Sequence, residues 1–259
     1  MRAAREAPRC VLITGATGGI GAALAREYAA PGMTLILHGR STQRLEAIAA
    51  DARSAGARVL TRVCDLRDVP ALRRWLAEVS AVETLDLFIA NAGVNTNIGA
   101  DRAGERWEAA EALLDTNVKG TIAGIDAVLP AMRRRRRGQI AIISSLAAFY
   151  GLPVTPSYSA SKAALKAYGE ALRGWLRSEG IRVNVVMPGY VESAMCREMP
   201  GPKPFLWPAQ RAARIIRRRL AADQPRISFP APLSWGCWWL SVAHPRVAER
   251  ILHLLHYDG

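Results

Sequence analysis

The feature that most constrains the fold is the alternation of short apolar segments with amphipathic ones. The apolar runs, rich in β-branched and aliphatic residues, lie at 10–14, 33–39, 57–64, 85–90, 138–145 and 181–188. The segments with helical periodicity lie at 19–30, 42–55, 68–80, 105–136 and 157–179. Runs that are almost continuously apolar are typical of strands covered by helices on both faces of a parallel sheet. The sequence therefore predicts an α/β fold with a doubly wound parallel sheet, whose ligands bind at the carboxyl ends of the strands.

No linker, internal repeat or low-complexity tract interrupts this alternation, so the sequence favours one domain over residues 1–259. After about residue 190 the pattern breaks into Pro-rich, aromatic and basic segments, so 190–259 is an extension of that domain. Within it, residues 210–222 have the pattern of a basic helix and 226–229 could form a last strand. The C-terminal end is expected to form a second short amphipathic helix.

The charge balance is strongly basic. The 35 Lys and Arg residues against 22 Asp and Glu give a formal net charge of +13. The densest cluster, Arg133 to Arg137, ends an apolar helical pattern and is followed by Gly138. Cations are favoured in the last turn of a helix and Gly commonly follows one, so we interpret this run as a helix end. No basic stripe interleaved with aromatic residues is present, and we expect no nucleic-acid partner.

Cysteine spacing and hydropathy bear on location. The cysteines are Cys10, Cys64, Cys196 and Cys237, and no two of them form a C-x-x-C pair. This spacing argues against a disulfide framework or a zinc site and favours a reducing cytoplasm. The basic N-terminus is not followed by an apolar segment, and no run of about 18 apolar residues exists. We therefore expect neither a signal peptide nor a membrane-spanning helix.

A glycine-rich turn follows the first predicted strand. The segment TGATGGIG (14–21) places Gly15, Gly19 and Gly21 between that strand and an amphipathic helix. Glycine allows a tight turn and the close approach of a pyrophosphate, and a helix N-terminus offers unpaired N–H groups and a positive dipole end. This G-x-x-x-G-x-G turn, placed between a strand and a helix, predicts a dinucleotide-binding site.

The end of the second predicted strand bears on which dinucleotide binds. An NAD site usually has an acidic residue about 20 residues after the glycine turn, where it binds the ribose 2′-hydroxyl. Here no acid lies between Glu27 and Glu46, and the strand ends in the letters HGRS. Arg40, with Ser41 and His38, could instead hold the 2′-phosphate of NADP by charge-assisted hydrogen bonds. We favour NADP(H), with NAD(H) as the alternative.

Three residues near the fifth strand suit acid–base chemistry. Tyr158 and Lys162 are four apart on a predicted helix, so they share one face about one 5.4 Å turn apart. An adjacent ammonium and a positive nicotinamide would bring the pKa of tyrosine down from about 10 toward neutrality. Ser145 stands at the end of the preceding strand and could hydrogen-bond a substrate oxygen. Together they favour general acid–base catalysis at a carbonyl or alcohol.

These motifs together resemble the short-chain dehydrogenase/reductase family. The matching segments, in the family's order, are TGATGGIG (14–21), CDL (64–66), NAG (91–93), ISS (143–145), YSASK (158–162) and PG (188–189). They span residues 10 to about 193, with one departure at Ala90, where the family usually has Asn. The resemblance implies a Rossmann-like fold and an oxidoreductase that transfers hydride reversibly between a nicotinamide and a substrate carbonyl or alcohol.

The resemblance also implies roles for individual residues. Tyr158 would be the general acid/base, Lys162 would lower its pKa and bind the nicotinamide ribose, and Ser145 would orient the substrate. Asn117 resembles the helix asparagine that holds a water in the proton relay to Lys162. The cofactor-binding residues expected besides Tyr158 and Lys162 are Gly15, Thr17, Gly19, Ile20, Gly21, Arg40, Ser41, Asp65, Leu66, Asn91, Ala92, Gly93, Pro188, Gly189, Val191 and Ser193.

The resemblance places a mobile substrate lid at residues 190–207. This segment is rich in Met, Pro and aromatic residues. With Leu146, Ala147, Leu152 and Pro153 it would form a largely apolar pocket, so we expect a hydrophobic carbonyl or alcohol as the substrate. No acid or base is clearly placed to select a charged substrate.

The same motifs bear on two rival functions and on the quaternary state. A non-catalytic dinucleotide-binding sensor or scaffold has no need of Ser145, Tyr158 and Lys162 together. A sugar-nucleotide epimerase or dehydratase of the extended branch has a different glycine spacing and a larger C-terminal substrate domain, for which 259 residues are too few. The family usually assembles through the helices that lie here at 105–136 and 157–179, which implies a homodimer or homotetramer.

The segment SWGCWWL (234–240) places three of the seven tryptophans within five residues. Residues 200–259 carry nine basic and three acidic residues, and basic charge beside tryptophan suits an anionic membrane interface. Packing over the pocket mouth or against a partner subunit is the more ordinary explanation, and all three remain open. Nearby, His253 and His256 lie close to Asp258 in the sequence, but no third ligand is evident and we expect no metal site.

Overall fold

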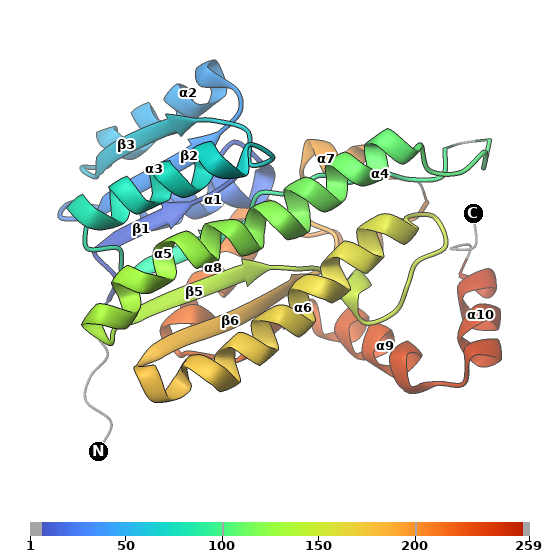
Figure 1. The fold of residues 1–259 in the computed structure, drawn as a ribbon. Coiled ribbons are helices and arrows are strands. Elements are labelled where there is room, and N and C mark those ends of the chain that lie inside the picture. The colour runs from blue at the N-terminus through green and yellow to red at the C-terminus, as the bar shows by residue number, and fades with distance from the viewer. Residues whose placement is uncertain (1–6, 100, 200, 256–259) are drawn as a thin grey trace.

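The computed structural model describes residues 7–99, 101–199 and 201–255 and contains a seven-stranded parallel sheet between two layers of helices (Figure 1). The strands are β1 (Cys10–Ile13), β2 (Thr34–Gly39), β3 (Arg58–Val63), β4 (Leu87–Ala90), β5 (Gly138–Ile143), β6 (Ile181–Pro188) and β7 (Arg226–Phe229). Their order across the sheet is β3-β2-β1-β4-β5-β6-β7. The order therefore reverses between β1 and β4, which is where ligands bind in doubly wound sheets. The predicted Rossmann-like sheet is confirmed.

The central strands β1, β2, β4, β5 and β6 are buried on both faces, which explains why they are largely apolar, whereas the edge strand β3 is exposed at most positions and carries two arginines. Successive side chains of a strand point to opposite faces, so Val11 and Ile13 pack against α1, α2 and α8, whereas Leu12 packs against α3, α5 and α6. These helices are α1 (Gly19–Tyr28), α2 (Thr42–Ser54), α3 (Val69–Val82), α5 (Thr121–Arg135), α6 (Pro156–Leu176) and α8 (Ala209–Ala221). A short 3-10 turn, η3 (Arg177–Glu179), follows α6.

The helix predicted over 105–136 is interrupted in its middle. It consists of α4 (Trp107–Leu114), a π-helical turn η1 (Asp115–Gly120) and α5. A π-helical turn widens the helix locally and redirects the side chains within it, and such turns are frequent at functional sites. Asn117 lies in this turn and points inward, where it is completely buried.

The basic run Arg133 to Arg137 ends α5, as its pattern predicts. Arg133 and the next two arginines form the last turn, and Arg136 follows in a left-handed conformation that terminates the helix. Arg133 pairs with Glu179, and Arg135 donates a hydrogen bond to the carbonyl of Leu85. The arginine run therefore forms the C-terminal end of α5.

The chain after β6 first extends the sheet and then leaves it. The short helix α7 (Ala194–Glu198) precedes α8 and β7, which confirm the helix and strand expected at 210–222 and 226–229. The tryptophan segment, for which no element was predicted, forms the helix α9 (Ala231–Val242), and α10 (Pro245–Leu254) is the expected terminal amphipathic helix. Figure 1 shows α9 and α10 projecting beside the end of α6. None of the helices in the described part of the chain is both long and apolar enough to cross a bilayer.

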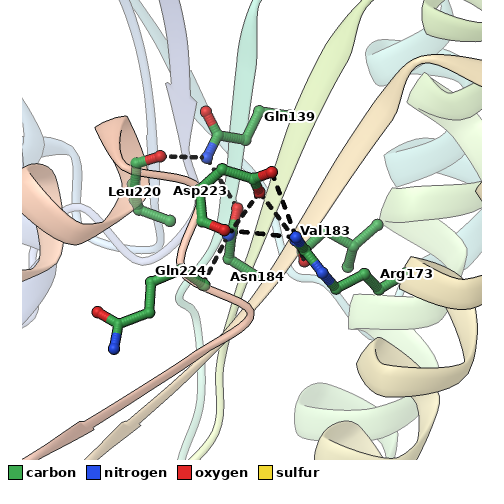
Figure 2. Close-up of polar contacts among 7 residues, drawn as sticks. All are labelled: Gln139, Arg173, Val183, Asn184, Leu220, Asp223 and Gln224. Atoms are coloured by element: carbon green, nitrogen blue, oxygen red, sulfur yellow. Dashed lines mark hydrogen bonds and ion pairs between the residues drawn. The ribbon is translucent and has the colours of Figure 1, made fainter. Parts of the chain in front are cut away.

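A buried polar network joins this C-terminal part to the sheet (Figure 2). Gln139 of β5 donates from its amide to Oδ1 of Asn184 at 2.7 Å and to the carbonyl of Leu220 at 2.9 Å. Asn184 of β6 in turn donates to Oδ1 of Asp223 at 3.2 Å, and Arg173 of α6 donates to the same oxygen at 2.8 Å. Buried amides must be paired in this way because an unpaired one costs free energy. The network therefore fixes the α8–β7 connection against β5, β6 and α6.

We expect Asp223→Ala to lower the free energy of unfolding by about 2 kcal/mol, because it removes the carboxylate that accepts from both the Arg173 guanidinium and the Asn184 amide and leaves each with its backbone acceptors alone. Chemical denaturation at pH 7 measures this. Asp51→Ala is the matched control, because Asp51 and Arg26 form an ion pair with both side chains about half exposed, and its loss should cost under about 1 kcal/mol. Equal losses in the two variants would contradict the structural role of the network.

The same carboxylate predicts a pH dependence of stability. Burial alone would raise the pKa of Asp223, but the hydrogen bond and charge of Arg173 outweigh it, and the pKa is lowered. A lowered folded-state pKa stabilises the fold at pH values above the unfolded pKa of about 3.9, and this contribution disappears as the pH falls through the folded pKa. The difference in unfolding free energy between wild type and Asp223→Ala should therefore shrink below about pH 4.

Candidate active site

The turn between β1 and α1 requires glycine at two positions. Gly15 has a φ of +65°, and a Cβ atom there would lie 2.7 Å from Cα of Ala92. A Cβ atom on Gly21 would lie 2.2 Å from the carbonyl oxygen of Gly15. Because both approaches are closer than side chains allow, glycine lets β1 turn directly into a helix that begins at Gly19. The first N–H groups of that helix have no partners within it, and Gly19 and Ile20 line the cleft described below.

A set of hydrogen bonds locks the adjacent ends of β1 and β4. The Thr14 hydroxyl accepts from the N–H groups of Asn91 at 3.0 Å and Ala92 at 3.1 Å. The Asn91 side-chain amide donates to the carbonyls of Thr14 and Gly15, both at 3.0 Å. Sequence analysis assigned Asn91 to the cofactor but gave Thr14 no role, although it opens the glycine motif. Thr14 and Asn91 therefore hold the glycine turn against the end of β4.

Two guanidinium groups lie at the end of the cleft nearest β2. Arg40 follows that strand, and Arg44 lies in the first turn of α2; both line the cleft. Within the described residues neither forms an ion pair. Asp65 also lines this end, but Arg67 pairs with it at 2.7 Å, and the hydrogen bonds from Arg67 lower the pKa of Asp65. This end of the cleft therefore presents two unpaired cations. Sequence analysis did not single out Arg44.

Two side chains expected to help bind a 2′-phosphate form hydrogen bonds within the protein instead. The Ser41 hydroxyl caps α2 by accepting from the Arg44 N–H at 3.4 Å, and Ser41 does not line the cleft. His38 is buried, its Nδ1 accepts from the Gly15 N–H at 3.4 Å, and its Nε2 lies 3.1 Å from the carbonyl of Cys64. Burial lowers the pKa of His38. The ring is thus neutral at pH 7 and supplies no positive charge.

The acid–base residues meet at the carboxyl end of β5. Tyr158 and Lys162 lie one turn apart on α6, and the ammonium nitrogen of Lys162 is 5.6 Å from the centre of the Tyr158 ring. Lys162 donates to the carbonyl of Ile143, the last residue of β5, at 3.0 Å. Ser145 starts the 3-10 turn η2 (Leu146–Ala148) and is hydrogen-bonded to Tyr158. The structure therefore brings the three predicted residues together.

Burial dominates the protonation of this group. Loss of hydration raises the pKa of Tyr158, and the hydrogen bond with Ser145 only partly opposes this. The same loss lowers the pKa of Lys162 to about 8. In the protein itself the pKa of Tyr158 thus moves opposite to the expected lowering, because desolvation is the largest effect on it. The lowering by Lys162 and a nicotinamide together remains a prediction about the complex.

Asn117 lies beneath these residues, in the π-helical turn. Its side-chain oxygen accepts from the Val94 N–H at 2.8 Å, and its amide donates to the Val94 carbonyl at 2.9 Å and to the Ser161 hydroxyl at 3.1 Å. A Cβ atom on Gly93 would lie 3.1 Å from the Asn117 oxygen and 3.3 Å from the Lys162 nitrogen. Gly93 therefore lets both groups approach the loop after β4. The water-holding role of Asn117 remains a prediction.

One cleft of about 750 Å³ joins all these groups. The predicted site residues that line it are Gly15, Thr17, Gly19, Ile20, Arg40, Asp65, Leu66, Asn91, Ala92, Gly93, Ser145, Tyr158, Lys162, Pro188, Gly189, Val191 and Ser193. Gly21, Ser41 and Asn117 lie behind its wall. The Ser193 hydroxyl also caps α7, accepting from the Cys196 N–H at 3.0 Å.

Comparison with known proteins identifies the family. The family model for short chain dehydrogenase matches residues 9–202, about three-quarters of the chain. The chain belongs to the short-chain dehydrogenase family. An uncharacterized oxidoreductase of Myxococcus xanthus is 37% identical over 227 residues, which cover 87% of this chain and 89% of that protein. The predicted family and its oxidoreductase class are therefore confirmed.

Solved structures of other short-chain dehydrogenases share the fold closely. One from Burkholderia cenocepacia in complex with NADP is 26% identical with a TM-score of 0.78, covering 94% of this chain and 97% of that one. Another from Mycobacterium paratuberculosis, bound to NAD, is 26% identical with a TM-score of 0.75, covering 88% and 98%. Members similar to this chain thus bind nicotinamide dinucleotides of both kinds.

The other half of the cleft in this short-chain dehydrogenase is apolar. It is lined by Val94, Leu146, Ala147, Leu152, Met195, Met199, Phe205, Leu233, Trp239, Leu240, Ile251, Leu252 and Leu255, with the rings of Tyr150 and Tyr190. No charged side chain of the described residues lines this half. The apolar pocket expected from the sequence is present, but Pro153 is not part of its wall. Helices α9 and α10 supply a large share of it, which fits the alternative in which the tryptophan segment packs over the pocket mouth.

The predicted lid segment is anchored at both ends. Val191 forms an isolated parallel bridge with Trp207. The Trp207 ring stacks on Phe229 of β7 at 5.1 Å between ring centres. The Arg211 guanidinium also contacts Trp207 and lies 4.0 Å from the centre of its ring. Between these anchors, α7 and the loop after it place Met195 and other apolar side chains over the substrate half of the cleft.

Proposed function

We propose that this short-chain dehydrogenase transfers hydride between NADP(H) and an uncharged hydrophobic carbonyl or alcohol. The observation that carries the proposal is the position of Tyr158, Ser145 and Lys162. They lie in one cleft, between an end with two unpaired guanidinium groups and an apolar chamber. A dinucleotide bound along the first half would have its reactive end beside these residues.

The residues around the cleft fit NADPH, and each would have a separate role in the reaction. Bound NADPH would supply the hydride. Tyr158, whose pKa is raised by burial, holds its proton at pH 7 and would donate it to the carbonyl oxygen of the substrate. Ser145 is hydrogen-bonded to Tyr158 and would hold that oxygen in place. Lys162 would bind the ribose, and its positive charge would stabilise the phenolate left on Tyr158. Asn117 would support the water through which the proton is replaced.

Preference for NADP over NAD is supported at the end of β2. An acid there would repel a 2′-phosphate, and none follows the strand; Arg40 and Arg44 face the cleft instead. Guanidinium groups bind phosphate by charge-assisted hydrogen bonds. The similar Burkholderia cenocepacia structure holds NADP. A non-catalytic sensor remains the alternative, and turnover decides between the two.

The experiment is a substrate panel with the purified full chain. NADPH consumption should be measured with long-chain and polycyclic ketones and aldehydes, and with the same compounds carrying a carboxylate. We expect turnover of the uncharged compounds and about 100-fold lower kcat/KM for the carboxylates, because a charge would be buried in the apolar chamber without a partner. NADPH binding without turnover of any carbonyl would favour the sensor. Preferential turnover of the carboxylates would contradict the proposed substrate class.

Quaternary state and location belong to the same proposal. We propose a homodimer or homotetramer that assembles through α4, α5 and α6, where Trp107 and Trp175 are exposed. All four cysteines are unpaired in the structure, which supports a reducing, cytoplasmic compartment.

A further inference from the structure

The exposed face of α9 is an apolar stripe. Trp235, Trp238, Trp239 and Val242 lie at positions i, i+3, i+4 and i+7, which form one face of a helix. Their exposed fractions are 74%, 49%, 48% and 62%. The opposite face buries Leu240 against α10 and the loop around Tyr150. The helix therefore does not need these three tryptophans for its packing, and soluble proteins rarely leave such a stripe in water without a function.

This stripe continues into the rim of the substrate cleft. Trp239 lines the cleft while half of its surface is exposed, and so do Phe205 of the lid segment and Leu255 after α10. Leu206 and Leu254 are exposed beside them in the chain. The apolar surface thus surrounds the opening through which a substrate reaches the apolar chamber. In Figure 1, α9 and α10 stand together at one end of the molecule, away from α1, α2 and α3.

Unpaired cations accompany the apolar surface. Arg246 and Arg250 lie exposed on α10, and Arg197 lies on α7 of the lid segment. Within the described residues none of these three forms an ion pair. From Ala231 to Leu255 the chain contains a single acid, Glu249. Tryptophan with arginine beside it is the combination that places protein surfaces in the headgroup region of an anionic bilayer.

We propose that α9, α10 and the lid segment dock this enzyme on an anionic lipid bilayer. The α9 stripe enters the headgroup boundary, the arginines contact anionic headgroups, and the mouth of the cleft opens toward the lipid. A hydrophobic substrate dissolved in the bilayer then reaches Tyr158 without crossing water. The docking itself does not depend on the reaction, whereas this route for the substrate rests on the proposed function.

The position of the stripe favours a bilayer over a second copy of the chain. A rigid subunit seated on Trp235, Trp238 and Trp239 would also cover the rim formed by Phe205 and Leu255, and would obstruct entry of a substrate. A fluid bilayer contacts the same surface and supplies an apolar substrate through it. Interfacial arginines without acidic partners also suit anionic lipid better than an identical basic surface.

The test is co-sedimentation of the full chain with phosphatidylcholine vesicles, with and without phosphatidylglycerol. We expect binding to the anionic vesicles that weakens with salt, and at least about tenfold weaker binding for Trp235→Ser/Trp238→Ser, neither of which lines the cleft. Val82→Ser is the control for the loss of exposed apolar surface. Val82 is 83% exposed at the end of α3, away from α9, α10 and the proposed subunit interface, so its replacement should leave vesicle binding unchanged.

Failure of the wild type to sediment with anionic vesicles would overturn the docking proposal, and so would unchanged vesicle binding by Trp235→Ser/Trp238→Ser. If the wild type does not bind vesicles and the double variant changes its oligomeric state, seen by light scattering, the stripe is a subunit interface. Turnover of a water-soluble ketone should be equal in wild type and variant. If that turnover is absent from both while vesicle binding remains, the proposed reaction fails and the docking stands.

Discussion

Tyr158→Phe is expected to abolish reduction of carbonyl substrates while NADPH binding stays nearly intact. The substitution removes only the phenolic hydroxyl, which is the proton donor that lies with Ser145 in the centre of the cleft. Loss of a positioned general acid typically costs about 10²–10⁴ in rate. Phe has the same ring as Tyr, so the packing of this buried position against Leu113 and Ala147 is kept. Steady-state turnover and NADPH titration by fluorescence measure the two effects separately.

Together, the two measurements distinguish the loss of the proton donor from damage to the cleft. A variant that loses turnover together with NADPH binding would indicate a damaged cleft rather than a missing proton. Near-wild-type turnover would contradict the mechanism itself. Ser145→Ala should fall between, because it removes the hydrogen bond to Tyr158 but leaves the proton donor in place.

Arg40→Ser/Arg44→Ser is expected to weaken NADPH binding about 100-fold and to leave NADH binding unchanged. Each charge-assisted hydrogen bond to an exposed phosphate contributes on the order of 1.4 kcal/mol, which is about tenfold, and two are removed. NADH lacks the 2′-phosphate, so it loses nothing. Calorimetric titration with both cofactors gives the ratio directly. The two single variants show whether Arg44, found only in the structure, contributes as much as Arg40.

Arg53→Ser controls for the loss of positive charge on the same helix. Arg53 lies on α2 but pairs with Glu46 outside the cleft, so its replacement should change neither affinity. If Arg53→Ser weakened NADPH binding as much as the double variant, general charge rather than a phosphate site would be responsible. If the double variant kept its preference for NADPH, the cofactor assignment would be wrong.

Local patterns were sufficient to predict the sheet and the centre of the site. The central strands could be located because they are buried on both faces and therefore largely apolar. The glycine turn could be located because Gly15 and Gly21 have no room for a Cβ atom, and Tyr158 and Lys162 because a spacing of four puts them on one helix face. These are constraints between residues that are close in sequence or adjacent to one element.

What could not be predicted depends on contacts between distant elements. Thr14 bonds across to β4, 77 residues later in the chain, and only the paired strands show that contact. The Ser41 hydroxyl was expected to face a phosphate, but helix capping uses it, because the first N–H groups of α2 need an acceptor. The surroundings of the tryptophan segment stayed open between the pocket mouth, a partner subunit and a membrane, and its helix was not predicted because the segment has no polar face to reveal a helical period.

The position of Gly93 sharpens the interpretation of the helix predicted over 105–136. Its lack of a side chain leaves space for Asn117 and Lys162, and the π-helical turn is what turns Asn117 toward that space. The sequence alone does not distinguish a regular α-helix from one with a π-helical turn, since the same residues suit both. The interruption follows from the contact with the loop after β4 rather than from local propensity.

The network around Gln139 sets a limit on how this protein can be divided. The family match ends at residue 202, yet Gln139 and Asn184, inside the sheet, take their partners from Leu220, Asp223 and Gln224. A fragment that stopped at the end of the match would lack the Leu220, Asp223 and Gln224 oxygens that accept from these two amides. The boundary of the family match is therefore not a boundary of folding, and engineers who exchange the substrate side of this enzyme must keep the chain through β7.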